Sequence, residues 1–195
     1  MTLSWVTLSG GACGGGDDDS VATPTGSKRD AAAVKGYPYP VEMFPNEASG
    51  ATARHFAEGE LEGYNAHDYD TQPPTSGKHL AELATPGVYD APPVPNEVAV
   101  HNMEHGYVIV WYNCNAEPML TPTDCTKLGN ALAAVVQPLV SSNHNIVLTP
   151  HLTMDPRIAL TAWQFMDVMD AVDNDRITKF IETFECHYDP EATCG

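Results

Sequence analysis

Four histidines between residues 55 and 105 have the residue type and spacing of a metal site. His101 and His105 lie four residues apart in the segment VHNMEHGYVIVWY, His79 ends the segment PPTSGKH, and His55 lies in TARHFAEG. On a β-strand His101 and His105 would be roughly 13 Å apart, whereas on one helical turn their Cβ atoms would be about 6 Å apart. We therefore predict that this segment coils into a turn, which Gly106 ends in a left-handed conformation before a strand begins.

The predicted site takes its third ligand from His79 and its fourth from His55. His79 follows a turn that is stiffened by prolines and contains Gly77, and such a turn can hold a side chain in place. Glu104 lies between the paired histidines, where it could bind the ion, orient a histidine or act as a base. Three or four imidazoles without a thiolate, in an exported protein, favour copper or zinc. The alternative is that these histidines only stabilise loops by donating hydrogen bonds to backbone carbonyls.

The methionines bear on the choice of metal. Thioether sulfur favours Cu(I), so nearby methionines make copper a better candidate than zinc. Met103 lies inside the histidine segment and is a candidate neighbour of the ligands, and Met154 lies further along the chain. Met166 and Met169 have the spacing of core residues on a helix, which is the favoured interpretation for them. The remaining histidines lie among polar or loop residues and are interpreted as surface or local structure: His67, His144, His151 and His187.

Two other functions compete with metal binding. HNMEH fits the H-x-x-E-H pattern of inverted zinc peptidases, in which His101 and His105 bind zinc, Glu104 activates water and a downstream residue such as Glu182 is a further ligand. That pattern belongs to a long helix of a larger domain, whereas here Gly106 and a strand follow it at once. The chain has no serine-hydrolase elbow, phosphate-binding loop or dinucleotide motif, so an enzymatic role is not favoured. A metal-free binding or scaffold module is the other alternative, with a tyrosine-rich surface formed by Tyr37, Tyr39, Tyr64, Tyr69 and Tyr89.

Composition and the N-terminus indicate a location outside the cytoplasm. The 195 residues fit one domain plus a tail, and the formal charge of −17 repels nucleic acid but accommodates cations. A short apolar run from Leu3 to Leu8 is followed by SGGAC, which ends at Cys13, and by GGGDDDS. This order resembles the signal peptide and lipobox of bacterial lipoproteins, although Gly10 stands where Leu is usual. We therefore predict a membrane-anchored lipoprotein, lipidated at Cys13 and facing the periplasm or the cell surface.

The cysteine count agrees with export. Of the five cysteines, four remain once Cys13 is set aside, and an even remainder suggests two disulfides in an oxidising compartment. The four are Cys114, Cys125, Cys186 and Cys194. Sequence alone allows three connectivities, and pairing within each sequence neighbourhood is favoured because it closes two short loops.

The predicted fold is α+β, with a small mixed sheet, helices packed on it, and a long proline-rich irregular wrap before it. Residues 1–35 are interpreted as signal remnant and flexible acidic linker, and residues 36–195 as one globular domain whose irregular part extends to about residue 97. Strands are expected at Glu97–His101, Tyr107–Tyr112, Asn145–Thr149 and Ile158–Trp163. Helices are expected at Thr121–Ser141, capped by Thr123 or Asp124, and at Asp173–Cys186, with a helical turn around Lys78–Ala84.

The order PPTSGKH, GVY, VHNMEHGYVIVWY, LTAW and FIETF resembles a bacterial and archaeal family known only as a domain of unknown function. Its hallmarks are a PPTSGxH turn and an HNxEHG turn, and the resemblance covers roughly residues 50–190. The family has Leu in place of Met103 and a GRxH-like segment in place of TARH, which ends at His55. The resemblance implies an extracytoplasmic location and a histidine-lined site, and it supplies no reaction.

Overall fold

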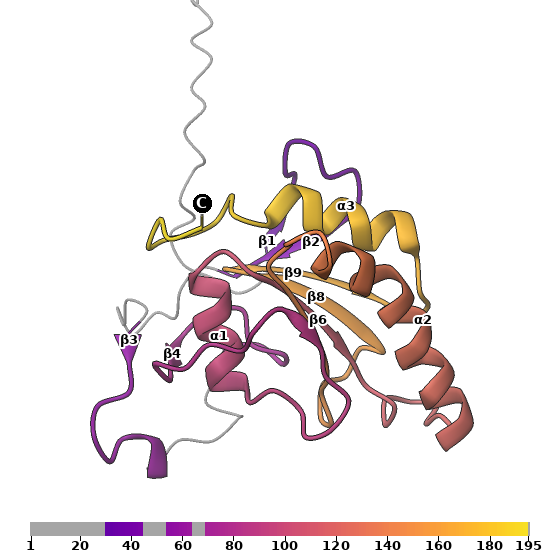
Figure 1. Ribbon diagram of the computed structural model, residues 1–195, viewed down its shortest axis with the longest axis horizontal. Coiled ribbons are helices and arrows are strands. Elements are labelled where there is room, and N and C mark those ends of the chain that lie inside the picture. The colour runs from indigo at the N-terminus through magenta and orange to yellow at the C-terminus, as the bar shows by residue number, and fades with distance from the viewer. Residues whose placement is uncertain (1–29, 45–53, 64–68, 195) are drawn as a thin grey trace, which may run out of the picture.

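The computed structural model describes residues 30–44, 54–63 and 69–194 of the chain (Figure 1). Its centre is a seven-stranded mixed sheet with the strand order β1-β2-β9-β8-β6-β7-β5. The strands of this sheet are β1 (Asp30–Ala32), β2 (Val41–Met43), β5 (Gly87–Val88), β6 (Val108–Tyr112), β7 (Ile146–Pro150), β8 (Ile158–Ala162) and β9 (Phe165–Met169). β6 is parallel to β7 and antiparallel to β8, so the predicted mixed sheet is confirmed.

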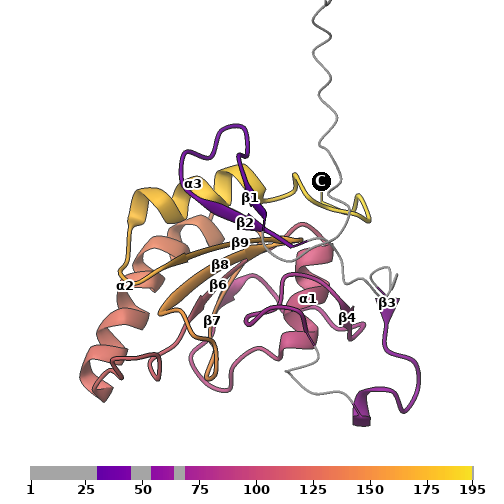
Figure 2. The same cartoon turned by 180° about the vertical axis from the view of Figure 1, so that it is seen from behind.

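Helices cover both faces of the sheet. They are α1 (Asn96–Glu104), α2 (Pro122–Val140) and α3 (Asn174–Phe184), and a short 3-10 turn, η1, spans Leu61–Gly63. α2 and α3 lie on one face, while α1 lies on the other beside a parallel ribbon of β3 (Arg54–His55) and β4 (Lys78–His79) (Figure 1 and Figure 2). The predicted α+β class with helices packed on the sheet is therefore confirmed.

Successive side chains of the central strands point to opposite faces of the sheet, so the core is divided into two apolar clusters. In β6 the side chains of Val108 and Val110 face the cluster under α2 and α3, whereas Ile109 and Trp111 face the cluster under α1. All four are completely buried, because β6 has a strand on each side and helices over both faces. This rigid strand directly follows the histidine segment and anchors its C-terminal end.

Two sequence-based assignments near the histidines are wrong. Glu97–His101 is not a strand, because the helix α1 spans Asn96–Glu104. Two β-branched residues in alternate positions, Val98 and Val100, suggested a strand. In the structure Val98 to Glu104 are all buried between the sheet and β4, and this tertiary packing overrides the local preference. The segment Lys78–Ala84 begins as the strand β4 rather than as a helical turn.

Elsewhere the expected elements are present, with three corrections. The α2 N-cap is Thr121, whose Oγ1 accepts a hydrogen bond from the backbone N–H of Asp124, so neither Thr123 nor Asp124 is the cap. Met166 and Met169 are core residues as expected, but they lie on the strand β9 and not on a helix. The strand β1 pairs with β2, so the sheet takes in the end of the segment 1–35 that composition assigned to the linker.

The cysteines form the two local disulfides that the sequence favoured. Cys114 is bonded to Cys125 and Cys186 to Cys194, across separations of 11 and 8 residues. The first joins the end of β6 to the start of α2, and the second closes the loop that follows α3. None of the helices within the described ranges is both long and apolar enough to cross a membrane.

Candidate metal centre

Three short elements bring the candidate ligands together. β4 ends at His79, and the strand β3 pairs with it in parallel so that His55 lies directly beside His79. α1 passes next to β4, and its last turn carries His101 and Glu104 on one face because they are three residues apart. The predicted turn is therefore the end of α1, and Gly106 has the left-handed φ of 76° that the prediction required.

The imidazoles of His55, His79 and His101 form a compact triangle. The ring centroids are 5.0 Å apart for His55 and His79, 4.9 Å for His55 and His101, and 5.0 Å for His79 and His101. Glu104 completes the group, and one ligand atom from each of the four residues lies within 4.8 Å of the others. Side chains of this kind, grouped at this spacing, can hold one metal ion.

Backbone carbonyls fix the orientation of two of the rings. Nδ1 of His79 lies 2.9 Å from the carbonyl oxygen of Gly77, and Nδ1 of His101 lies 3.0 Å from that of Glu82. A carbonyl oxygen can only accept a hydrogen bond, so each Nδ1 carries the proton and each Nε2 keeps its lone pair. This arrangement is typical of histidines that bind a metal through Nε2.

The centre of the group is buried and lacks a compensating cation among the described residues. His79 is completely buried and Glu104 is 4 % exposed. Glu104 Oε2 lies 2.9 Å from His79 Nε2, yet Nε2 forms no hydrogen bond with any part of the chain that the structure describes. When Glu104 is ionised, two electron-rich atoms face each other at ligand distance in a group of which only His55 is exposed, and a bound cation would stabilise this arrangement.

Burial shifts the protonation of both partners toward the neutral form. Burial, helped by charge repulsion from His101 and His55 and opposed by the hydrogen bond to the carbonyl of Gly77, lowers the pKa of His79 to about 4. Burial also raises the pKa of Glu104 to about 7, with Glu191 and Asp189 adding to the effect. The pKa of His101 is lowered too, first by burial and then by His105 and His55. Neutral imidazoles are the form that binds metal ions.

His105 does not join this group of four but extends it toward solvent. Its Nε2 lies 3.0 Å from His101 Nε2 and 3.2 Å from Glu191 Oε2, and its Nδ1 lies 2.8 Å from Thr193 Oγ1. The sequence placed His105 beside His79 and His101 as one of three primary ligands. The structure brings His79 and His101 together and places Glu104, rather than His105, with them.

Other residues that hold the cluster could not be recognised from the sequence. Asn102 clamps the chain after β4, because its side chain donates to the carbonyl of Ala84 and accepts from the N–H of the same residue. Glu60 accepts two hydrogen bonds from Arg54 and one from Lys78, and so ties β3 to β4. The only signal for Asn102 is its place inside HNMEH, and nothing in the sequence marks Glu60.

The remaining candidates lie outside the group. Met103, Met154 and Met166 are buried in the apolar cluster under α1, and Met169 in the opposite cluster. Glu182 pairs with Lys179 on the surface of α3. His187 is exposed and contacts the backbone carbonyl of Glu185, as expected. His144 contacts Glu185, 41 residues away, and His151 is buried against Trp111, so these two make tertiary contacts instead of the surface or local ones that were expected. His67 and Cys13 lie outside the described residues.

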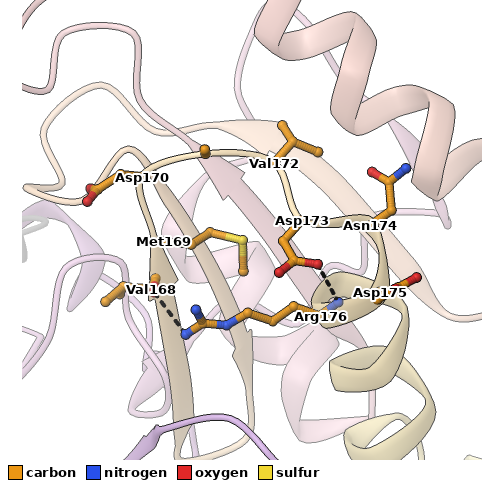
Figure 3. Close-up of a pocket in the computed structure, with 9 residues that line it drawn as sticks. Val168, Met169, Asp170, Val172, Asp173, Asn174, Asp175 and Arg176 are labelled. Carbon is orange, nitrogen blue, oxygen red and sulfur yellow. Dashed lines mark hydrogen bonds between the residues drawn. The ribbon is translucent and has the colours of Figure 1, made fainter.

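A separate surface pocket lies at the turn between β9 and α3 (Figure 3). It is lined by residues 168–176, including Asp170, Asp173 and Arg176. Asp173 caps α3 by accepting from the N–H of Arg176, and the guanidinium of Arg176 is turned toward Asp167 and Val168. Its polar groups thus serve the helix start, and none of the candidate ligands lines this pocket.

Comparison with known proteins gives one match. A family model described as "Protein of unknown function (DUF3105)" matches residues 62–195. His79, His101 and Glu104 lie inside the matched range, and His55 lies before it. No curated protein and no solved structure matches the chain.

Proposed function

The chain belongs to the DUF3105 family of proteins of unknown function, and we propose its function from the site itself: it binds one divalent transition-metal ion through His55, His79, His101 and Glu104. The observation that carries the proposal is the pair His79 Nε2 and Glu104 Oε2, buried and 2.9 Å apart without a hydrogen bond between them. When Glu104 is ionised, such a pair is costly in a mostly buried site unless a cation lies between the two atoms.

Copper or zinc suits this set of ligands best. Imidazole binds both ions well, and a carboxylate is an ordinary fourth ligand for Zn²⁺ and for Cu²⁺. The buried methionines offer no argument for Cu(I), because packing in the core accounts for them. We propose a role in binding or handling the ion.

The test is metal analysis of protein purified without an affinity tag. We expect one copper or zinc ion per chain, and a loss of the ion in His79→Ala and His101→Ala but not in the control His187→Ala, which changes an exposed histidine. A free metal concentration one hundred times Kd should add about 2.7 kcal/mol of stability, which corresponds to a rise in Tm of roughly 5–10 °C.

Two outcomes would redirect the proposal. Protein that carries no metal and whose Tm does not change with added copper or zinc would favour a metal-free binding or scaffold module. Peptide hydrolysis that Glu104→Gln abolishes while the metal is retained would favour a zinc-dependent hydrolase.

We also propose that the protein is exported and anchored to a membrane through a lipid on Cys13. Two disulfides support export, because disulfides persist mainly in oxidising compartments. The apolar run and small residues before Cys13 support the anchor. Mass spectrometry of protein from a bacterial membrane fraction should find a diacylglycerol on Cys13, and release of the Cys13→Ser variant into the soluble fraction is expected. An unmodified Cys13 in the mature protein would reject the anchor.

A further inference from the structure

On the side of α1 that faces the loop after α3, the proposed metal site continues toward solvent through further side chains that can bind a cation. We propose that His101, His105 and Glu191 form an outer metal station, which receives a divalent cation from solvent and passes it to the inner group of His55, His79 and Glu104. This inference rests on the proposed function, since the inner group must bind metal for the outer station to load it.

Two of the contacts among the outer residues, both made by His105, have the spacing of neighbouring ligands around one ion. His105 Nε2 is 3.0 Å from His101 Nε2 and 3.2 Å from Glu191 Oε2. Two ligands that each bind an ion at about 2.1 Å are separated by roughly 3.0–3.4 Å. Thr193 Oγ1 can accept the proton of His105 Nδ1 at 2.8 Å, which leaves Nε2 of His105 free to bind.

Exposure falls from Glu191 and His105 to Glu104 and His79, while His55 lies at an exposed edge of the inner group. The side chain of Glu191 is 47 % exposed and that of His105 is 21 % exposed, whereas Glu104 and His79 are 5 % and 1 % exposed. An ion that arrives on the side of the loop after α3 meets the outer carboxylate and imidazole first. Two of the three outer ligands remain in contact with water, which gives a weak and labile site, as expected of a place from which an ion is handed on.

His101 is the residue that both groups share. Its Nδ1 is engaged with the carbonyl of Glu82, so Nε2 is its only nitrogen that can bind an ion. In the transfer the bond from His101 Nε2 to the ion is kept, the bonds to His105 and Glu191 break, and bonds to His79 and Glu104 form. The ion keeps its charge throughout, no electron is transferred, and the Nδ1 protons stay in place.

The outer station is built by the disulfide-closed loop after α3. Figures 1 and 2 show this segment returning over the end of α1, and the N–H of Cys186 donates to the carbonyl of Gly106. A Cβ at Gly106 would lie 3.1 Å from Cys186 Cα, 3.1 Å from Cys194 Cβ and 3.2 Å from Asp189 Cβ. This close approach holds Glu191 and Thr193 against His105, which lies 86 to 88 residues earlier in the chain.

The experiment compares rates with affinities. Full-length protein, freed of metal, is mixed with Zn²⁺ in a stopped-flow instrument, and a chromophoric chelator reports both uptake and release. In Glu191→Gln and His105→Gln we expect uptake and release each to slow at least tenfold, while Kd changes less than threefold. His79→Ala should instead raise Kd by a hundredfold or more. Glu182→Gln is the matched control, because it removes the same charge from an exposed site on α3 and should leave both rates unchanged.

Each other result overturns a defined part of the proposal. Wild-type rates in both outer variants, with normal Zn²⁺ affinity, would overturn the outer station and leave the inner site intact. A rise in Kd in Glu191→Gln as large as in His79→Ala would make Glu191 a ligand of the final site and would overturn the transfer. Slowing in Glu182→Gln equal to that in Glu191→Gln would reduce the effect to net charge. No binding of Zn²⁺ or Cu²⁺ by the wild type would overturn both the station and the proposed function.

Discussion

Two buried polar clusters lie on opposite faces of the sheet, and within the described residues the carboxylate of one is paired with a cation and that of the other is not. On the face of α2 and α3, Asp167 accepts hydrogen bonds from Arg176 Nε, at 2.7 Å, and from Tyr37. The guanidinium of Arg176 also lies 5.2 Å from the ring centre of Tyr39. On the face of α1, the carboxylate of Glu104 faces a histidine nitrogen that bears a lone pair, and no described Lys or Arg pairs with it.

The difference separates a structural network from a binding site. A carboxylate that is buried with a bidentate guanidinium and a phenol has every demand met, and removing one partner leaves a charge uncompensated. A carboxylate that is buried among neutral imidazoles, with no Lys or Arg beside it in the described part of the chain, is stabilised by its own protonation or by a bound cation. If this distinction is right, removing the carboxylate should lower the stability of the protein in the first cluster and raise the stability of the metal-free protein in the second.

The largest effect is expected in the first cluster. Asp167→Asn leaves the charge of Arg176 without its partner in a mostly buried position, and we expect a loss of about 3 kcal/mol or more in the free energy of unfolding. Urea unfolding at pH 7 measures it. Asp170→Asn, on the exposed turn next to it, should change stability by about 0.5 kcal/mol or less. Equal effects of the two substitutions would show that the hydrogen bonds of Asp167 with Tyr37, before β2, and with Arg176, on α3, contribute little to stability.

His151, whose pKa is shifted by burial and not by a charged partner, extends the comparison to the pH dependence of stability. His151 is 6 % exposed, its Nδ1 accepts from the N–H of Met154, and burial lowers its pKa to about 4. The unfolded chain therefore takes up this proton first as the pH falls from about 6.5. We expect wild type to lose about 3 kcal/mol from this group between pH 6.5 and 4, and His151→Gln to be spared that loss. If the free energies of unfolding of His151→Gln and of the exposed control His187→Gln depend on pH in the same way, then His151 is not held in its neutral form by burial.

Much of this arrangement could be predicted from the sequence, and the reasons differ by residue. The four-residue spacing of His101 and His105 and the glycine after them required a helical turn, and the β-branched run after it required a buried strand. The side-by-side position of His55 and His79 rests on strands of two residues each, which are too short to leave a periodic pattern. The place of Glu104 inside the group followed only once α1 was known to be a helix, since on a strand it would have pointed away from His101. Glu191 reaches His105 across the whole second half of the chain, and no local pattern encodes such a contact.

The second cluster should respond to the loss of its carboxylate with the opposite sign. Because the pKa of Glu104 is raised to about 7, the contribution of this carboxyl group to the stability of the metal-free protein is fully present below about pH 4.5 and is lost as the pH rises through about 7. At pH 8, Glu104→Gln should therefore stabilise the metal-free protein by about 1–3 kcal/mol, while it weakens metal binding. Thermal unfolding with and without Zn²⁺ measures both. A variant that is less stable without metal, as Asp167→Asn is expected to be, would place Glu104 in a structural network and not in a binding site.

The smallest effect is expected for Glu60, which holds two strands of the site together but is not itself a candidate ligand. Glu60 joins β3 to β4 by accepting from Arg54 Nη1 and Nη2, at 2.8 and 2.6 Å, and from Lys78. Glu60→Gln weakens this connection, so His55 should occupy its position beside His79 for less of the time. We expect a rise in the Kd for Zn²⁺ of a few-fold, below the tenfold or greater effects common for residues that orient metal ligands, and no change in Tm without metal. Glu62→Gln removes the same charge from the same turn and should leave Kd unchanged. A rise in Kd as large as that in His79→Ala would show that β3 is an obligatory part of the site, whereas identical behaviour of the two glutamine variants would show that the ion pair does not position His55.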